Sequence, residues 1–304
     1  MSSALSKPRR RRGAVSRRSL LVAPLCVGLV PRAGVAAADA VVGDGDTPRL
    51  RELEARYGGR LGVAALDLGS GRRMSYRSDE RFAMCSTFKL LTAALVLTRV
   101  DRRQESLDRR VVYRQDQLVP YSPISGKHAD GSGMTIGELC EAAVTLSDNT
   151  AANLLLDSFG GPVRLTAYLR SLGDPITRLD RAEPELNTAV AGDPRDTTTP
   201  LSMLEDIRRL TIGAALLPAS RAQLIAWLVG CKTGDKRLRA GVPAGWRVGD
   251  KTGTGDNNTA NDVGVIWPPE RQPIVVVALY TQSATTDLQR DEVLASVGQM
   301  AASL

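Results

Sequence analysis

Apolar and polar positions alternate with a period of about two in several stretches near both ends of the chain. One such stretch is followed by Gly69-Ser70-Gly71 and a second short stretch, which predicts a β-hairpin. The stretches near the C-terminus are apolar, β-branched and separated by turn residues, which predicts antiparallel strands there. The predicted strands are residues 60–68, 72–77, 246–251, 263–267 and 274–280.

Between these strands the apolar positions follow the helical period, and helix-capping residues separate the helices. Thr135 and Glu138 form a capping box that opens a helix ending near Leu146. Pro162 begins another helix, which stops at Gly173. The other predicted helices are residues 90–100, 151–159, 200–210, 219–229 and 284–303.

This order of elements predicts an α+β fold. We expect an antiparallel sheet of about five strands from both ends of the chain, with helices on its faces as a three-layer α/β sandwich. Residues 39–84 and 237–304 then form the α/β lobe, and residues 85–236 form an inserted all-helical lobe, with the active site between them. The helical lobe contains a loop, residues 177–196, without apolar periodicity, and loops of that length are usually functional.

Residues 1–38 have the composition of an export signal: a basic segment, a short apolar run and the small residues of a cleavage site. Arg17-Arg18 followed by Ser-Leu-Leu resembles a twin-arginine signal, and the alternative is a basic tail that binds nucleic acid. The segment holds eight basic and no acidic residues, so its removal leaves 32 of the 40 bases against 33 acids. We therefore expect an exported protein, secreted or extracytoplasmic, with no nucleic-acid partner and no membrane anchor after cleavage.

The residues that usually bind metals or form disulfides are few. The cysteines beyond residue 38 are Cys85, Cys140 and Cys231, an odd number without the spacing of a disulfide framework or a zinc site. The only histidine, His128, lies in a polar loop and is interpreted as a solvated surface residue. We expect no metal and no cofactor.

Ser86 and Lys89 are the first candidates for chemistry. A serine and a lysine three residues apart on a helix share a face, so the ammonium can lie beside the hydroxyl. At the start of the predicted helix the hydroxyl also meets oriented N–H groups, which suit an anionic intermediate. The alternative for the isolated motif is a helix cap followed by a surface lysine.

Two further short motifs carry hydroxyl and amine groups. Ser147-Asp148-Asn149 follows a predicted helix, and alone it is also an ordinary cap. Lys251-Thr252-Gly253 ends a predicted strand, where a lysine and a hydroxyl can bind a carboxylate. Lys232-Thr233-Gly234 repeats the last motif, but it follows a predicted helix, so Gly234 is interpreted as a C-cap and Lys232 as a dipole-compensating base.

The long loop contains a group of charged and amide residues. Arg181 and Asp196 can join the loop ends by a salt bridge, which leaves Glu183 and Asn187 to face inward. The alternative is a set of solvated loop charges.

Together and in this order, these motifs resemble those of the class A serine β-lactamases, from about residue 50 to the C-terminus. The chain looks most like the actinomycete enzymes of this family. The resemblance implies Ser86 as the nucleophile, the backbone N–H groups of Ser86 and Thr254 as the oxyanion hole, and Glu183 as a base acting through a water shared with Asn187. The substrate-binding residues that it implies are Tyr121, Asn149, Asn187, Arg237, Lys251, Thr252, Gly253 and Thr254.

The family activity is hydrolysis of β-lactam antibiotics, which confers resistance, by a monomer without cofactor. Either Lys89 directly or Glu183 through water accepts the serine proton, and Ser147 relays a proton to the ring nitrogen. A D-Ala-D-Ala peptidase and a β-lactam sensor that stays acylated are the alternative functions. The Glu183-bearing loop favours hydrolysis, because Glu183 activates the deacylating water.

Three departures from the family pattern concern substrates and packing. Ala93 stands where many members have a cysteine that pairs with the one at position 140, so Cys140 is expected to be a free, buried thiol. Gly255 stands where carbapenem-hydrolysing members pair a cysteine with the one at position 85, so strong carbapenemase activity is not expected. Residues 256–262 contain no base, and Arg237 is expected to reach the substrate carboxylate instead.

Overall fold

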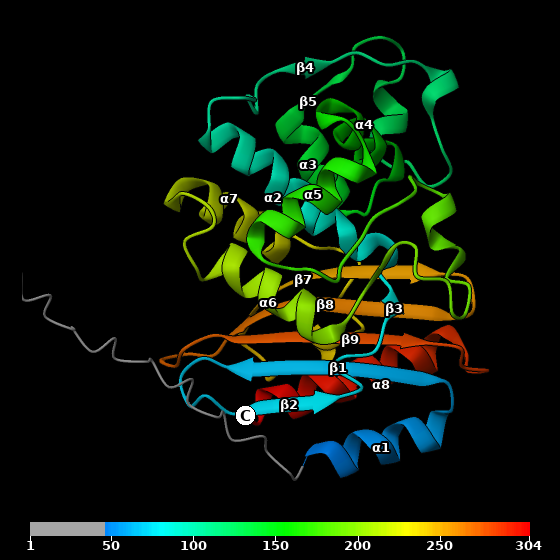
Figure 1. Ribbon diagram of the computed structural model, residues 1–304, viewed down its shortest axis with the longest axis vertical. Helices are drawn as coiled ribbons and strands as arrows, with labels where there is room; N and C mark the ends of the chain where they lie inside the picture. Colours follow the sequence, from blue (N-terminus) through cyan, green and yellow to red (C-terminus); the bar gives the residue numbers. More distant parts are fainter. Residues whose placement is uncertain (1–45) are drawn as a thin grey trace, which may run out of the picture. The chain divides into compact units, whose positions relative to one another are not determined.

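The computed structural model describes residues 46–304, and the predicted signal segment lies outside them. Figure 1 shows a twisted antiparallel sheet with helices on both faces, so the predicted fold class is confirmed. The strand order is β2-β1-β9-β8-β7. These strands are β1 (Arg60–Asp67), β2 (Arg73–Tyr76), β7 (Arg247–Gly255), β8 (Thr259–Trp267) and β9 (Ile274–Thr281).

The sheet joins the two ends of the described chain. β1 forms the predicted hairpin with β2 and pairs on its other edge with β9, where Ala64 lies opposite Val277. β7 extends beyond the predicted strand end to Gly255, because Lys251, Thr252 and their neighbours stay in register with β8. Candidate site residues therefore lie within an edge strand, whose geometry is set by the ladder.

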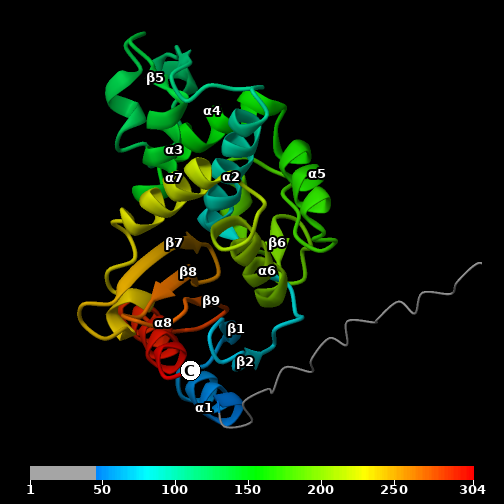
Figure 2. The same cartoon turned by 90° about the vertical axis from the view of Figure 1, so that its left-hand side faces the viewer.

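One face of the sheet is covered by α1 (Asp46–Tyr57) and α8 (Asp287–Ala302) (Figure 2). Their apolar residues form a buried cluster with the sheet side chains that point the same way, for example Leu50, Val276 and Val293. Helix α1 was not predicted, since charged residues dominate it and only Leu50, Leu53 and Tyr57 pack on the cluster.

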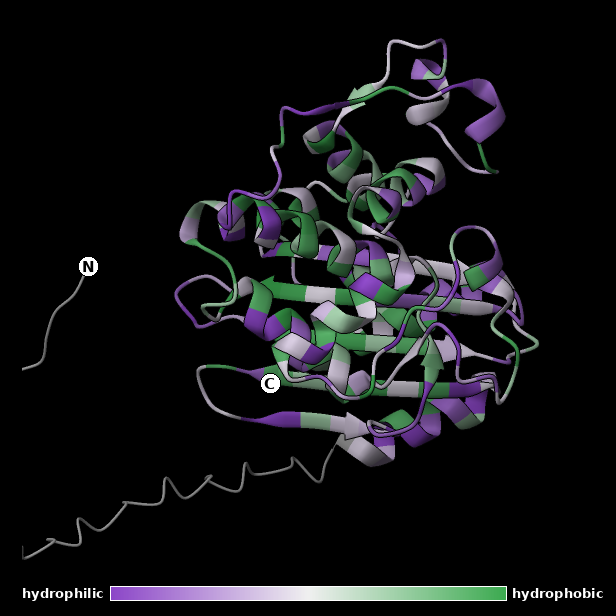
Figure 3. Cartoon of the chain, turned by 45° about the horizontal axis from the view of Figure 1, so that its top comes forward, coloured by the Kyte–Doolittle hydropathy of each residue, from purple (hydrophilic) through white to green (hydrophobic). Residues whose placement is uncertain are grey.

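The other face carries α6 (Pro200–Thr211), which packs on β1 and β9, and α7 (Pro218–Val229), which packs on β7. Figure 3 shows the resulting pattern: apolar residues follow the strands and the inner sides of the helices, and polar residues lie outside. None of the helices in residues 46–304 combines the length and the apolar character that crossing a membrane requires.

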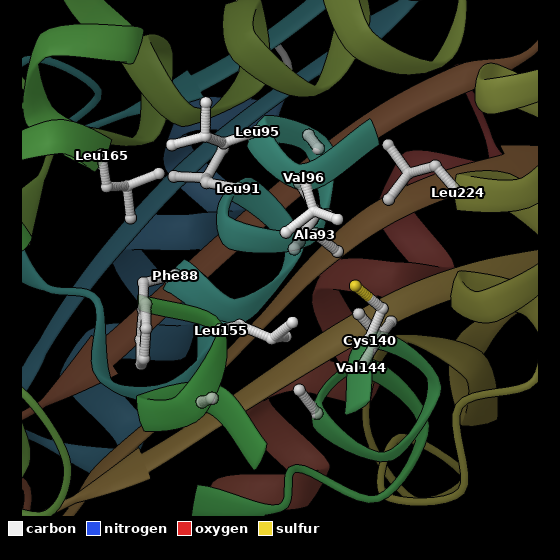
Figure 4. Packing of buried hydrophobic residues seen from close by; sticks show 14 of the residues in the cluster. Phe88, Leu91, Ala93, Leu95, Val96, Cys140, Val144, Leu155, Leu165 and Leu224 are labelled. Carbon is white, nitrogen blue, oxygen red and sulfur yellow. The ribbon is translucent and has the colours of Figure 1, made fainter. Parts of the chain in front are cut away.

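The remaining helices surround α2 (Phe88–Asp101), which is buried along most of its length (Figure 4). They are α3 (Ile136–Thr145), α4 (Asn149–Phe159) and α5 (Pro162–Leu172). Thr135 and Glu138 form the predicted capping box of α3. Gly160 and Gly173 end α4 and α5 in the left-handed conformation, as their positions in the sequence predict.

Short elements connect these layers and bring the long loop beside the start of α2. β3 (Phe82–Ala83) pairs with β6 (Thr197–Thr198), so the end of the loop lies beside the segment that leads into α2. β4 (Arg110–Val111) pairs with β5 (Met134–Thr135). The 3₁₀ turns are η1 (Cys85–Thr87), η2 (Gln115–Gln117), η3 (Ser125–His128), η4 (Glu185–Thr188) and η5 (Leu238–Gly241).

Candidate active site

A cleft of about 400 Å³ lies where β7, η1, the long loop and the start of α4 meet. It brings together residues that are far apart in the sequence. Its lining is Ser86, Tyr121, Ser147, Asn149, Asn187, Thr233, Arg237, Thr252 and Thr254. All of these residues except Thr233 were predicted from the sequence to be catalytic or substrate-binding.

Another cavity, of about 460 Å³, lies on the outer side of the long loop. Its walls include Arg60 and Arg195, whose guanidinium groups bind Glu80 and Asp193. It contains no nucleophile with a neighbouring base, so the smaller cleft is the candidate active site. Within the described chain, no cluster of His, Cys, Asp and Glu side chains is able to hold a metal ion.

Ser86 lies in η1, directly before α2, in a turn that three parts of the chain hold in place. Met84 N–H donates to Asp196 O at 2.9 Å, and the Asn261 amide donates to Met84 O at 3.0 Å. Gly253 approaches so closely that an added Cβ would lie 2.7 Å from Met84 O. Cys85 takes a φ of 45°, an uncommon conformation that is typical of functional sites with a fixed backbone.

Lys89 contacts the candidate nucleophile and three other polar residues around it. Its ammonium donates to Ser86 Oγ at 2.9 Å, to the Asn149 side-chain oxygen at 2.6 Å and to Ser147 O at 2.8 Å. It also forms a 2.9 Å ion pair with Glu183. Burial lowers the pKa of Lys89 below its usual value, although Glu183 opposes that shift.

Glu183 reaches the candidate nucleophile, Ser86, from the long loop. Ser86 Oγ donates to one of its carboxylate oxygens at 3.2 Å, and the Asn187 amide donates to the other. Asn153 on α4 binds the Glu183 backbone twice, accepting from its N–H and donating to its C=O, both at 2.9 Å. None of the short motifs assigns a role to Asn153, so this positioning contact was missed in the sequence.

Ser147 lines the cleft, and the fully buried Lys251 lies against it. The Lys251 ammonium donates to Ser147 Oγ at 3.1 Å and to Thr252 O at 2.8 Å. Burial lowers the pKa of Lys251 to about 8, and the charge of Lys89 acts in the same direction. Asp148 points away from the cleft, where it caps α4 and accepts N–H groups of the η3 turn.

Arg237 reaches the end of β7, as the missing base in residues 256–262 suggested. Its guanidinium donates to Thr254 Oγ1 and Gly253 O, both at 2.9 Å, and pairs with Asp291 at 2.9 Å. Arg239 instead forms an ion pair with Asp250, a fully buried residue of β7.

The interpretation of Lys232-Thr233-Gly234 was partly wrong. Helix α7 ends at Val229, and its C-cap is Gly230 and not Gly234. Gly234 is packed against the Asp250 carboxylate, where an added Cβ would lie 1.7 Å from an oxygen, and Thr233 lines the cleft. The C-cap interpretation used only the order of residues after the helix. The positions of Thr233 and Gly234 depend instead on how the connection after α7 folds back on β7.

The salt bridge predicted for the loop ends is present. Arg181 Nε lies 2.6 Å from a carboxylate oxygen of Asp196, whose side chain is shielded from solvent. The other Asp196 oxygen accepts the backbone N–H groups of Asp180 and Arg181. The loop is thereby closed on itself, with Glu183 and Asn187 on its inner side.

The remaining predicted residues lie at the edges of the site or outside it. Tyr121 is 59 % exposed at the rim of the cleft. Gly255 lies beside Cys85, because an added Cβ would be 2.6 Å from its sulfur. Cys140 is a free, buried thiol, as expected, in the core that also contains Ala93 (Figure 4). His128 is half-buried in η3 and does not line the cleft.

Comparisons with known proteins agree along the whole described chain. A model of the "Beta-lactamase enzyme family" matches residues 47–303. Beta-lactamase OXY-1 of Klebsiella oxytoca is 47% identical over 93% of this chain and 96% of its own length. Beta-lactamase Toho-1 of Escherichia coli is 49% identical over 83% of this chain and 86% of its own length. Among solved structures, an ancestral (GNCA) class A β-lactamase has a TM-score of 0.83 and 63% identity, covering 84% of this chain and 98% of its own.

Proposed function

The chain belongs to the class A serine β-lactamases and hydrolyses β-lactams, and from that premise we propose that Ser86 is its nucleophile. The observation that carries this assignment is the position of the Ser86 hydroxyl between Lys89 and Glu183, at 2.9 and 3.2 Å. A serine hydroxyl is a weak nucleophile, and a base within hydrogen-bond distance makes it reactive.

In the acylation step Ser86 Oγ forms a bond to the β-lactam carbonyl carbon, and the ring C–N bond breaks. The backbone N–H groups of Ser86 and Thr254 stabilise the negative charge that develops on the carbonyl oxygen. Ser147 donates its proton to the departing ring nitrogen and recovers one through Lys89 or Lys251, both of which contact its hydroxyl.

The proton of Ser86 has two acceptors within reach. Glu183 accepts the hydrogen bond of Ser86 directly, so it takes the proton without rearrangement. Lys89 accepts the proton when its amine is neutral, either after it passes a proton to Glu183 across their 2.9 Å ion pair or because burial lowers its pKa. In both routes the charge moves within one buried cluster, in which electrostatic interactions are strong.

In the deacylation step a water molecule attacks the ester carbonyl, Glu183 takes its proton, and the ester C–O bond breaks to free Ser86. Asn187 and Asn153 orient Glu183 for this step through its side chain and its backbone. The contact between Glu183 and Ser86 favours turnover over the two alternative functions. A β-lactam sensor remains acylated and needs no base for deacylation, and a D-Ala-D-Ala peptidase has no loop that resembles the one carrying Glu183.

The substrate carboxylate is proposed to bind against Lys251, Thr252, Thr254 and Arg237. Arg237 and the hydroxyls of Thr252 and Thr254 line this end of the cleft, and the buried Lys251 ammonium contacts Ser147, which also lines it. Tyr121, Asn149 and Asn187 then contact the rest of a small β-lactam. Strong carbapenem hydrolysis is not part of the proposal, because Gly255 cannot form a disulfide with Cys85.

Further assignments rest on the sequence and the family. We propose that residues 1–38 are an export signal of the twin-arginine type, and that the mature enzyme is a secreted or extracytoplasmic monomer of actinomycete kind. Residues 39–84 and 237–304 are proposed as one lobe of the fold, and residues 85–236 as the other.

Covalent labelling tests the nucleophile. Ser86→Ala should still bind benzylpenicillin but lose the penicilloyl adduct, which mass spectrometry detects. Ser106→Ala, at an exposed serine remote from the cleft, is the matched control and should label fully. A stoichiometric adduct on Ser86→Ala would show that another residue attacks the ring.

A further inference from the structure

The connection between α7 and η5 brings Thr233 into the cleft, and none of the sequence motifs assigns a role to this residue. Thr233 lines the cleft, half-buried, and its Oγ1 lies 2.5 Å from Oγ1 of Thr252. Thr252 is 5% exposed, and this is the hydrogen bond that the structure places on its hydroxyl.

The position of Thr233 relative to β7 is set by packing on both sides. Lys232 N–H donates to Thr145 O at 2.9 Å, which ties the segment to the end of α3. Gly234 is pressed against Asp250, the residue before Lys251 on β7, at a distance that admits no side chain. Thr233 is held between these two points, so its hydroxyl faces Thr252 in a defined place.

A third polar group extends the contact away from the cleft. The Cys231 sulfur lies 3.4 Å from Thr233 Oγ1, and its thiol is free and buried. Burial raises the pKa of Cys231 above its usual value, so the sulfur keeps its proton and is a weak donor. The three groups form a chain from Cys231 through Thr233 to Thr252.

Counting donors and acceptors fixes the direction of the hydrogen bonds in this series of three groups. Each threonine hydroxyl has one proton, and a carboxylate accepts hydrogen bonds only. When Thr252 donates to a bound carboxylate, its oxygen accepts from Thr233, and Thr233 in turn accepts from the Cys231 thiol. Every proton of the chain then points toward the anion, and hydrogen bonds aligned in this way polarise one another.

The geometry points to Thr233 as a positioning residue for β-lactam turnover, whose hydroxyl fixes the rotamer and the proton of Thr252 so that Thr252 donates to the substrate carboxylate. This inference rests on the proposed carboxylate site at Lys251 and Thr252. Thr233 acts through Thr252 and leaves the bond-breaking steps at Ser86 unchanged. Its effect therefore falls on substrate binding, and only for substrates that carry the carboxylate.

The first experiment compares benzylpenicillin with its methyl ester. Thr233→Val keeps the shape and removes the hydroxyl, and it should raise KM for the acid about fivefold, the effect of one neutral hydrogen bond, with kcat within about twofold. The same variant should leave kcat/KM for the ester unchanged. Thr233→Ser should restore the acid KM, and Lys232→Ala, at an exposed neighbour, is the control.

The second experiment places Thr233→Val in a Thr252→Val background. If Thr233 acts through Thr252, it should add nothing to KM there, because the group it orients is gone. An effect that persists in this background would overturn the inference, since Thr233 would then contact the substrate itself. Thr233→Ala provides the same comparison should the valine variant not fold.

The single Thr252→Val variant tests the carboxylate site separately from the role of Thr233. A raised KM for the acid in Thr252→Val, together with an unchanged KM in Thr233→Val, would overturn only the role of Thr233. An unchanged KM in Thr252→Val would remove Thr252 from the proposed carboxylate site and would overturn the inference about Thr233 with it.

Discussion

Lys89 and Glu183 form an ion pair of 2.9 Å with both side chains fully shielded from solvent. One residue comes from the first turn of α2 and the other from the long loop, so the pair joins the two segments that the chemistry requires. A buried pair is costly to break, because the remaining charge loses its partner without gaining water. The same contact therefore ties the long loop to α2 beside Ser86, the proposed nucleophile.

Replacing Glu183 should separate the two chemical steps. Glu183→Gln keeps the shape of the side chain but removes the base, and deacylation has no substitute base. Stopped-flow absorbance should show a burst of about one equivalent of opened ring, followed by a stalled phase. Glu185→Gln, at an exposed neighbouring position, should turn over normally. Full steady-state turnover by Glu183→Gln would contradict the assignment.

Asp196→Asn should loosen the long loop. The substitution removes the charge that pairs with Arg181, while a side-chain oxygen remains for the backbone N–H groups. We expect lower penicillin turnover, faster proteolytic cleavage within residues 177–196 and improved hydrolysis of bulkier cephalosporins. Asp193→Asn removes a more exposed ion pair of the same loop and should change little. Unchanged kinetics and unchanged proteolysis in Asp196→Asn would contradict the role of this salt bridge.

Arg237→Ala should raise KM for penicillins with a smaller fall in kcat. The guanidinium lies at the carboxylate end of the cleft, and the loss of one charged hydrogen bond costs about 1.5–3 kcal/mol. Arg239→Ala is the matched comparison, because it leaves Asp250 buried without its partner and should act mainly by lowering Tm. A kcat/KM within about twofold of the wild type for Arg237→Ala would leave Lys251 and the threonines as the carboxylate site.

The stability of the fold should depend on pH through Asp206. Its carboxyl is buried on α6 beside Asp174, and burial, followed by the charge of Asp174, raises its pKa to about 9. In the unfolded chain an aspartate ionises near its usual pKa of about 4, so between roughly pH 4 and 9 the folded state holds a proton that the unfolded state has released. The stability linked to this proton is full below about pH 4 and is lost as the pH rises toward 9.

Urea unfolding between pH 5 and 9 measures this effect. The free energy of unfolding of the wild type should fall with rising pH more steeply than that of Asp206→Asn, which cannot release a proton at this position. Glu205→Gln, next to it and less buried, should keep the wild-type slope. Equal slopes for the wild type and Asp206→Asn would exclude a protonated Asp206.

Export should depend on Arg17 and Arg18. Replacing both by lysine should retain the precursor in the cytoplasm, because twin-arginine export requires the pair itself and not its charge. Replacing Arg11 and Arg12 by lysine in the same way is the control. N-terminal sequencing of the exported enzyme should begin near Asp39, and an exported chain that still carries residues 1–38 would refute the signal.

Much of the local structure follows from the sequence alone. Thr135, Pro162 and Gly173 cap helices where they were expected to, because capping depends on a few neighbouring backbone groups. The five strands follow from apolar and β-branched stretches, and the resemblance of the short motifs identifies the family. These features depend on interactions within a few residues, or on residue types in a fixed order.

The tertiary structure alone decided which side chains meet. Thr233 joins the cleft, and Asn153 holds Glu183, through contacts between residues that are 19 and 30 positions apart. The length of β7 depends on its ladder with β8, which keeps polar residues such as Thr252 in register. Such contacts depend on how loops close and on how sheets and helices pack. The secondary-structure preferences of neighbouring residues do not determine the distance between two segments that are remote in the chain.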